Sequence, residues 1–208
     1  FEHRTIISDQ DRQLIAHPDK DKILCVPNGI DKSFFENVER PEKFDFVFVG
    51  NMSYPPNVDA VAYIVNEILP EFKNSTLLIS GAKPNSYVVK MANANSKVEL
   101  TGWVDDIRKS YVNGKIFLAP MMIGTGMQNK LLEAMALKTP CITTDLANNA
   151  IEANPDSQIL VGNSKQEILY KIELLLNNPE LREKIAIGGH NYVRDNFSWS
   201  KSTEELID

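Results

Sequence analysis

A glycine-rich run in the middle of the chain carries the residues best suited to chemistry. The segment Gly124–Gly126 follows an apolar stretch and opens a helical pattern, and the N–H groups at the start of a helix bind anions. Lys130 and Glu133 lie four and seven residues after Gly126, so the three positions share one stripe of the predicted helix. This order of amides, amine and carboxylate suits a nucleotide, with a diphosphate over the amides and Lys130 and a ribose diol donating to Glu133. The structural alternative is a solvated Lys–Glu pair three residues apart.

Six short β-rich runs, with helical patterns between most of them, must position this glycine-rich run. They are continuously apolar, as parallel strands covered on both faces are, and they span Asp45–Val49, Thr76–Ser80, Lys97–Leu100, Lys115–Ala119, Cys141–Thr144 and Gln158–Val161. An apolar stripe from Val58 to Phe72 predicts a helix after the first strand. The capping-box spacing of Ser164 and Glu167 predicts another helix after the last. Strands alternating with helices predict an α/β fold, a doubly wound, Rossmann-like parallel sheet.

Loops that follow the first three of these strands also contain glycine and polar residues. They contain Gly50–Asn51, Gly81–Lys83 and Gly102–Val104 in turn. Ligands of open parallel sheets bind at the carboxyl ends of the strands, and glycine lets a ligand approach the backbone closely. Ordinary strand-to-helix turns also favour glycine, so each loop taken alone leaves both interpretations open.

A dinucleotide-binding fingerprint is the main rival interpretation of the glycine-rich run. Gly124, Gly126 and Asn129 are one residue short of G-x-G-x-x-G, and Asp145 ends the next strand where a ribose-binding acid belongs. However, Asn129 would hinder close packing of helix and strand. The loop is also longer than the fingerprint needs, and it follows the fourth strand of the sheet instead of the first. We therefore rank a nicotinamide or flavin enzyme below the nucleotide site described above.

Composition limits the classes of function. The net charge is −6, which argues against a nucleic-acid partner. Cys25 and Cys141 lie in apolar runs and read as reduced core thiols. No apolar run is long enough to span a membrane and no signal sequence opens the chain, so we expect a soluble, cytoplasmic protein. The three histidines are scattered and no Cys/His cluster suggests a metal, so we expect none.

The run Gly124–Ala136 resembles the G-x-G-x-x-x-K-x-L-E-A-M-A signature of family-4-type glycosyltransferases, which have the GT-B fold. Four other stretches resemble that family in the same order: Val26–Asp31, Val49–Asn57, Thr101–Asp105 and Phe197–Trp199. The resemblance implies that residues 36–195 form the C-terminal domain, which binds a nucleotide sugar. Residues 1–35 would be a remnant of the N-terminal acceptor domain with its linker. Residues 196–208 would form the helix that crosses back to that domain.

The resemblance also implies roles for individual residues. Glu133 would hold the donor ribose, Gly126–Gln128 the diphosphate, and Trp103 with Val104 would border the base. The full set of implied donor-binding residues is Gly50, Asn51, Lys83, Trp103, Val104, Gly124, Thr125, Gly126, Met127, Gln128, Lys130 and Glu133. Two departures from the family stand out: Thr125 occupies the place of the first acid in E-x7-E, and Lys83 is the only candidate for an Arg/Lys pair after the first two strands. No catalytic residue is assigned.

The function implied is transfer of a sugar from a nucleotide-diphosphate donor to an unknown acceptor, in the synthesis of a cell-surface polysaccharide or glycoconjugate. We expect no cofactor besides the donor. The acceptor site, and any general base, would lie on a missing N-terminal domain, which could also dock on a membrane. The alternatives are a non-catalytic nucleotide-binding module and a nucleotide-sugar epimerase on the same scaffold.

Overall fold

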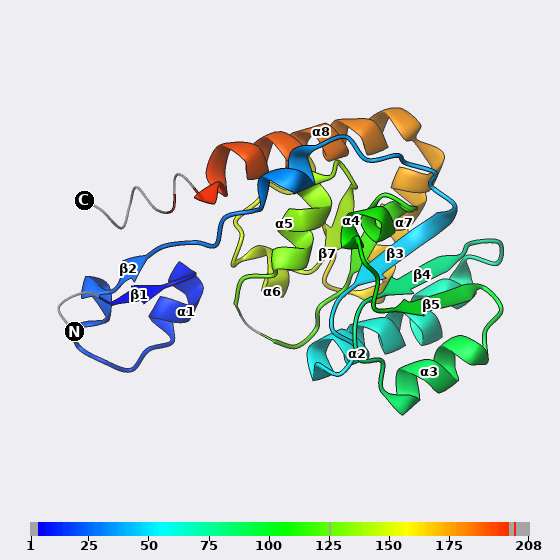
Figure 1. The fold of residues 1–208 in the computed structure, drawn as a ribbon, viewed down its shortest axis with the longest axis horizontal. Helices are drawn as coiled ribbons and strands as arrows, with labels where there is room; N and C mark the ends of the chain where they lie inside the picture. Colours follow the sequence, from blue (N-terminus) through cyan, green and yellow to red (C-terminus); the bar gives the residue numbers. More distant parts are fainter. Residues whose placement is uncertain (1–3, 125, 200–201, 203–208) are drawn as a thin grey trace.

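The structure is a computed structural model that describes residues 4–124, 126–199 and 202 (Figure 1). The first half contains β1 (Thr5–Ile6), α1 (Asp9–Gln13), η1 (Lys20–Lys22), β2 (Leu24–Cys25), η2 (Lys32–Phe35), β3 (Phe44–Val49), α2 (Pro55–Tyr63), η3 (Ile64–Ile68), η4 (Leu69–Glu71), β4 (Leu77–Ser80) and α3 (Ser86–Asn93). The second half contains β5 (Val98–Gly102), α4 (Ile107–Tyr111), β6 (Gly114–Ala119), α5 (Asn129–Ala136), β7 (Cys141–Thr143), α6 (Asp145–Asn148), β8 (Leu160–Val161), α7 (Lys165–Asn177) and α8 (Pro179–Asn196).

The main body is built on a six-stranded sheet with the order β5-β4-β3-β6-β7-β8, in which every neighbouring pair is parallel. This confirms the predicted α/β fold with a doubly wound, Rossmann-like sheet. The chain steps outward from β3 to β5 and then returns to build β6, β7 and β8 on the other side. Because such crossovers are right-handed, α2 and α3 lie on one face and α4 and α5 on the other. The loops after β3 and β6 therefore diverge, which opens a crevice between them.

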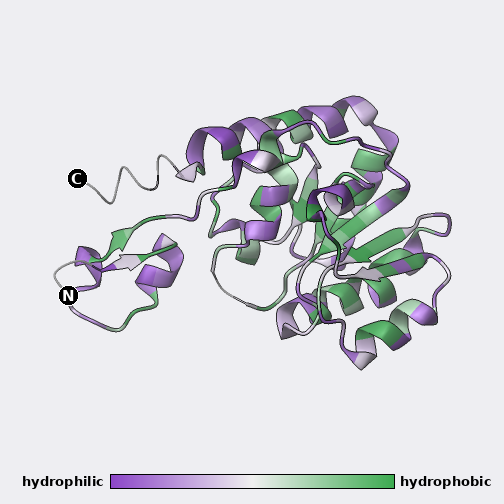
Figure 2. Cartoon of the chain, in the orientation of Figure 1, coloured by the Kyte–Doolittle hydropathy of each residue, from purple (hydrophilic) through white to green (hydrophobic). Residues whose placement is uncertain are grey.

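Burial of the strands follows their place in the sheet. The residues of β4 and β7 are all buried, as are the last four of β3 and of β6. Figure 2 shows hydrophobic residues concentrated in the strands of the sheet. The prediction of a continuously apolar, covered strand at Lys97–Leu100 is wrong. Strand β5 alternates between exposed and half-buried residues because it lies at an edge of the sheet, where it is covered less than the inner strands. An edge strand has a neighbour on one side only.

The helices after the first and last strands are placed as predicted, with one break. The apolar stripe from Val58 to Phe72 does face the core, but α2 passes into a π-helical turn, η3, and then into the short 3₁₀ helix η4. Pro70 lies in the first turn of η4, and proline lacks the N–H that would continue an α-helix. The capping box of Ser164 and Glu167 is present at the start of α7, as predicted.

Residues 4–28 form a small unit to one side of the main body in Figure 1. Strands β1 and β2 pair in parallel, with α1 between them in the sequence. Helix α1 ends at Gln13. The stretch that follows this unit contains η2, whose Phe34 and Phe35 pack against the main core.

The two cysteines differ in burial. Cys141 is completely buried in β7, as predicted for a core thiol. The same prediction is wrong for Cys25, which is only half-buried. Cys25 lies in β2, and this strand belongs to the small two-stranded sheet instead of the covered six-stranded one.

Near its two ends, the chain packs against itself. The Ile30 N–H donates to the Phe197 carbonyl oxygen at 2.8 Å, and the Ser202 hydroxyl donates to the Pro27 carbonyl oxygen at 2.8 Å. A Cβ at Gly29 would overlap the Trp199 backbone, so only glycine fits there. Most of the predicted helix 196–208 lies outside the described residues. Within the residues described, no helix is long and apolar enough to cross a membrane.

Two glycines with left-handed backbones give a test of the packing between the loops after β3 and β4. A Cβ at Gly81 would overlap the Gly50 carbonyl oxygen, whereas one at Gly102 would meet nothing within 4 Å. We expect Gly102→Ala to lower the free energy of unfolding by about 1 kcal/mol, from backbone strain alone. Gly81→Ala should lower it by roughly 3 kcal/mol, because a clash is added. Urea unfolding of both variants measures the difference, and equal losses would contradict the close approach.

Candidate functional site

The loops after β3, β4 and β5 surround a pocket of about 280 Å³ at the carboxyl edge of the sheet. It is lined by Val49, Gly50, Asn51, Gly81, Ala82, Trp103, Val104 and Ile107. Four of the predicted site residues, Gly50, Asn51, Trp103 and Val104, therefore come together. The Trp103 side chain stands at the rim with 70% of its surface exposed. A pocket of this size accommodates a nucleobase, and the exposed indole offers an apolar face for stacking.

The glycines of the first two loops serve packing. Gly81 carries no side chain because its Cα lies against the Gly50 backbone. A Cβ at Gly50 would lie 2.6 Å from the Asn57 side-chain nitrogen. Close packing of the turns is therefore enough to explain both glycines, without a ligand. Lys83, the predicted cation of the second loop, has a left-handed backbone, is exposed and is not among the residues lining the pocket.

Lys130 occupies a largely apolar position beside this pocket. Its ammonium donates to the Asn57 side-chain oxygen, lies 3.7 Å from the Met121 sulfur and stands 5.3 Å from the centre of the Phe48 ring. Burial lowers the pKa of Lys130 to about 8, and the negative charge of Glu133 opposes this shift in part. Lys130 is therefore not a solvated surface cation, so the alternative of a solvated Lys–Glu pair is wrong for this residue.

Glu133, one turn further along α5, is held by a residue of α4. The Tyr111 hydroxyl donates to its carboxylate at 2.6 Å, and Tyr111 is completely buried in α4. Burial raises the pKa of Glu133, while the Tyr111 hydrogen bond and the Lys130 charge act in the other direction. The predicted lysine and carboxylate thus share one desolvated region, each with a fixed hydrogen-bond partner.

The helix that carries both residues begins later than predicted. Gln128 is the residue that precedes its first turn, so α5 starts at Asn129 and not at Gly126. Gly124 and Gly126 have left-handed backbones, which cannot continue a right-handed helix. The first-turn amides therefore belong to Asn129 and Lys130, and Gly126 and Met127 form the loop ahead of them. Thr125 lies outside the described residues.

The small N-terminal unit lies against this glycine-rich loop. A Cβ at Gly126 would be 3.2 Å from a carboxylate oxygen of Asp11 in α1. The Asn28 side-chain amide is 3.5 Å from the side-chain oxygen of Asn129 at the start of α5. The loop is thus bordered by α1 on one side and by α5 on the other, where the small unit meets the main body.

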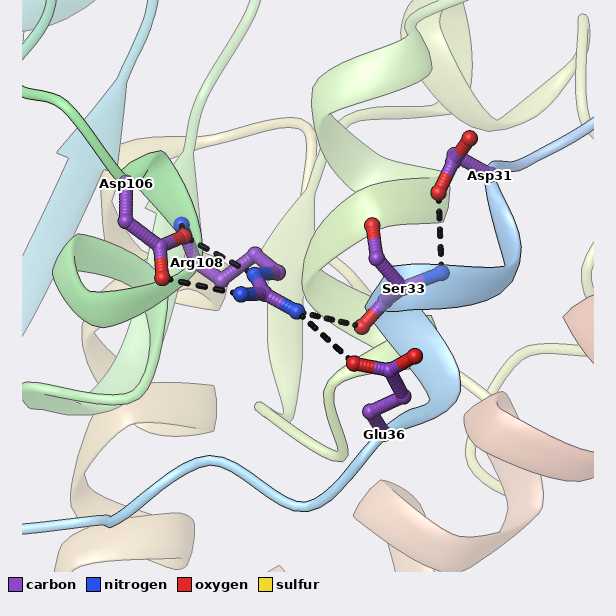
Figure 3. Close-up of polar contacts among 5 residues, drawn as sticks. All are labelled: Asp31, Ser33, Glu36, Asp106 and Arg108. Atoms are coloured by element: carbon purple, nitrogen blue, oxygen red, sulfur yellow. Dashed lines mark hydrogen bonds and ion pairs between the residues drawn. The ribbon is translucent and has the colours of Figure 1, made fainter.

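Helix α4 is fixed to the connection that leads into β3 (Figure 3). Asp106 caps the helix and pairs with the Arg108 guanidinium at 2.8 Å. Arg108 in turn donates to the Ser33 carbonyl oxygen at 2.9 Å and to the Glu36 carboxylate at 3.4 Å. Because α4 also carries Ile107 and Tyr111, this network sets the position of a pocket wall and of the donor to Glu133.

Sequence reasoning assigned no role to three residues of the site: Asn57, Tyr111 and Met121. Asn57 stands next to the apolar stripe that begins at Val58, and a polar residue at the edge of such a stripe is the one signal that could have found it, because buried polar groups are hydrogen-bonded. Tyr111 and Met121 gave no such signal, because aromatic and sulfur side chains are ordinary core residues. Among the described residues, no group of three or more His, Cys, Asp or Glu side chains could hold a metal ion.

The strand order of the sheet defines a class of domain. A parallel, Rossmann-like sheet of this order corresponds to the C-terminal half of GT-B glycosyltransferases. Residues 43–178 match the family described as "Glycosyl transferases group 1". The chain belongs to this family, so it is a glycosyltransferase domain.

Several known proteins are similar to this chain. The capsular polysaccharide biosynthesis glycosyltransferase CapM of Staphylococcus aureus is 30% identical over 157 residues, covering 68% of this chain and 41% of CapM. The structure of Anabaena HepE in complex with UDP and glucose has a TM-score of 0.83 at 12% identity, covering 99% of this chain and 62% of HepE. The C-terminal domain of LpcC from Francisella tularensis has a TM-score of 0.66 at 18% identity, covering 82% of this chain and all of that domain. The chain spans less than half the length of the curated relatives it matches.

The Tyr111–Glu133 hydrogen bond can be tested in the carboxylate's titration. We expect Tyr111→Phe to raise the pKa of Glu133 further, because the hydrogen bond that favours the charged form is lost while burial remains. The shift is measured by NMR titration of the glutamate side-chain carbons. Tyr170→Phe in α7 is the control, since Tyr170 is 59% exposed. An unchanged Glu133 titration in Tyr111→Phe would contradict the role of the hydroxyl.

Proposed function

We propose that this chain is the donor-binding half of a glycosyltransferase that transfers a sugar from a nucleotide-diphosphate sugar to an acceptor. The observation that carries the proposal is the pairing of Lys130 and Glu133 on one stripe of α5, both desolvated and both held by fixed partners. A partly buried cation and a partly buried carboxylate one turn apart match the diphosphate and the ribose of one nucleotide. The neighbouring pocket at Trp103 and Val104 is then the place for the base.

We propose UDP as the nucleotide and a cell-surface polysaccharide as the product. The structural relative HepE was determined with UDP and glucose, and CapM is described as a capsular polysaccharide biosynthesis enzyme. Since the chain spans less than half of its relatives, we also propose that the acceptor site lies on another domain.

In this proposal the leaving diphosphate is stabilised by the protein itself. The Lys130 ammonium lies in surroundings of low dielectric, where its attraction for phosphate oxygens is stronger than in water. The amides of the glycine-rich loop and of the first turn of α5 add partial positive charge. We propose that the reaction needs no metal ion and no cofactor besides the donor.

Nucleotide titration tests the donor site directly. We expect this chain to bind UDP more tightly than GDP or ADP in calorimetric titrations. Glu133→Ala should lose about 10- to 100-fold in UDP affinity, because hydrogen bonds from the ribose diol to a charged group are removed. Glu173→Ala, at an exposed position on α7, is the matched control and should bind normally. Equal affinity in Glu133→Ala would remove the carboxylate from the site.

The pH dependence of UDP binding tests Lys130. Its pKa of about 8 in the free protein should rise when phosphates approach, because a nearby negative charge favours the ammonium form. UDP affinity should therefore fall as the pH rises above about 8, and binding near pH 8 should take up protons. Calorimetry in buffers of different ionisation enthalpy measures this uptake. Lys130→Met should bind UDP weakly and should take up no protons on binding. Proton uptake that persists in this variant would mean that another group titrates.

A further inference from the structure

The amide side chain of Asn57 connects two loops of the proposed donor site. Asn57 lies in the first turn of α2 and is 4% exposed. Its side-chain nitrogen donates to the Asn51 carbonyl oxygen at 3.0 Å, and its side-chain oxygen accepts from the Lys130 ammonium. One buried side chain therefore fixes the loop after β3 and the lysine of α5 with respect to each other.

We propose that Asn57 is a positioning residue that holds the Lys130 ammonium toward the diphosphate while leaving its positive charge uncompensated. This inference rests on the proposed function for the diphosphate. It goes beyond that function by assigning to Asn57 control over the charge of the phosphate-binding lysine.

The neutrality of the amide is the important property. Among the described residues, the groups in contact with the Lys130 ammonium are the Asn57 side-chain oxygen, the Met121 sulfur and the face of the Phe48 ring, and each of these is uncharged. The charge that acts on the pKa of Lys130 comes from Glu133. A carboxylate at position 57 would neutralise the lysine before any phosphate arrived. An apolar residue there would leave the ammonium without its acceptor.

The space around Asn57 also fits this role. A Cβ at Gly50 would lie 2.6 Å from the Asn57 side-chain nitrogen and 3.0 Å from its amide carbon. The absence of a side chain at Gly50 therefore lets the amide reach both of its partners. If Asn57 served only to pack α2 against the core, removal of the amide and a change of its charge would have similar effects. If it positions Lys130, the two changes act differently on the lysine.

The first experiment needs no ligand. Lys130 is titrated by NMR of labelled lysine side chains in the wild type, in Asn57→Asp and in Asn66→Asp. Asn66 is exposed in η3, so its variant adds the same charge away from the site. We expect Asn57→Asp to raise the pKa of Lys130 by at least about one unit, a tenfold change in the protonation equilibrium, and Asn66→Asp to leave it unchanged. An equal titration in all three proteins overturns the proposal.

The second experiment uses UDP in the calorimetric titration. Asn57→Asp should lose at least about tenfold in affinity at neutral pH and should take up no proton near pH 8, since its lysine is already charged. Asn57→Ala should also bind more weakly, but it should keep the proton uptake. Both variants lose the hydrogen bond to the Asn51 carbonyl oxygen, so the difference between them reports on the charge. If both weaken binding equally and both keep the uptake, Asn57 is a packing residue and the proposal is wrong.

The two experiments separate the two proposals. If the wild type binds none of the nucleotides, the proposed function fails, while the NMR titration still decides whether Asn57 controls the charge of Lys130. If UDP binds and Lys130 titrates identically in the wild type and in Asn57→Asp, the proposed function stands and the positioning role fails.

Discussion

The reversal of strand order between β3 and β6 is the constraint on which the site depends. Because β3 leads outward to one side of the sheet and β6 to the other, their loops separate and leave the carboxyl edge open at that point. The loop after β3 supplies the backbone around Gly50, and the loop after β6 leads into α5 with Lys130. Neither loop forms the site alone. Asn57 connects them, because its side chain forms hydrogen bonds to the Asn51 carbonyl oxygen in one loop and to the Lys130 ammonium in α5.

The charged side chains of this site are partly removed from water. Desolvation shifts the pKa of both Lys130 and Glu133 toward their neutral forms, so the fold carries an energetic cost at this place. The Tyr111 hydroxyl bonds to Glu133, and the Asn57 side-chain oxygen bonds to Lys130. Both partners are uncharged, so these hydrogen bonds offset the cost of desolvation only in part. Perturbed titratable groups of this kind concentrate at functional sites. A purely structural role would be better served by two apolar residues or by a direct ion pair.

The sequence predicts the sheet well and the site in part. Continuous apolar runs mark strands such as β4 and β6, because two covering layers leave no polar face. The same rule fails at β5, whose edge position depends on strand order and not on local pattern. The spacing of Lys130 and Glu133 predicts their shared stripe, yet it places the helix start three residues early, since the left-handed backbone of Gly126 is a property of the folded loop. The hydrogen bonds of Tyr111 and Asn57 span 22 and 73 residues of sequence, a range that no local pattern reaches.

Helix α4 contacts both the connection that leads into β3 and the residues of the proposed site. Through Arg108 it holds the connection at Ser33 and Glu36, and through Tyr111 it holds Glu133. The connection leads back to Ile30, which is bonded to Phe197 at the end of α8. Helix α4 also forms a wall of the pocket through Ile107, so one short helix contacts both the connection into β3 and the proposed donor site.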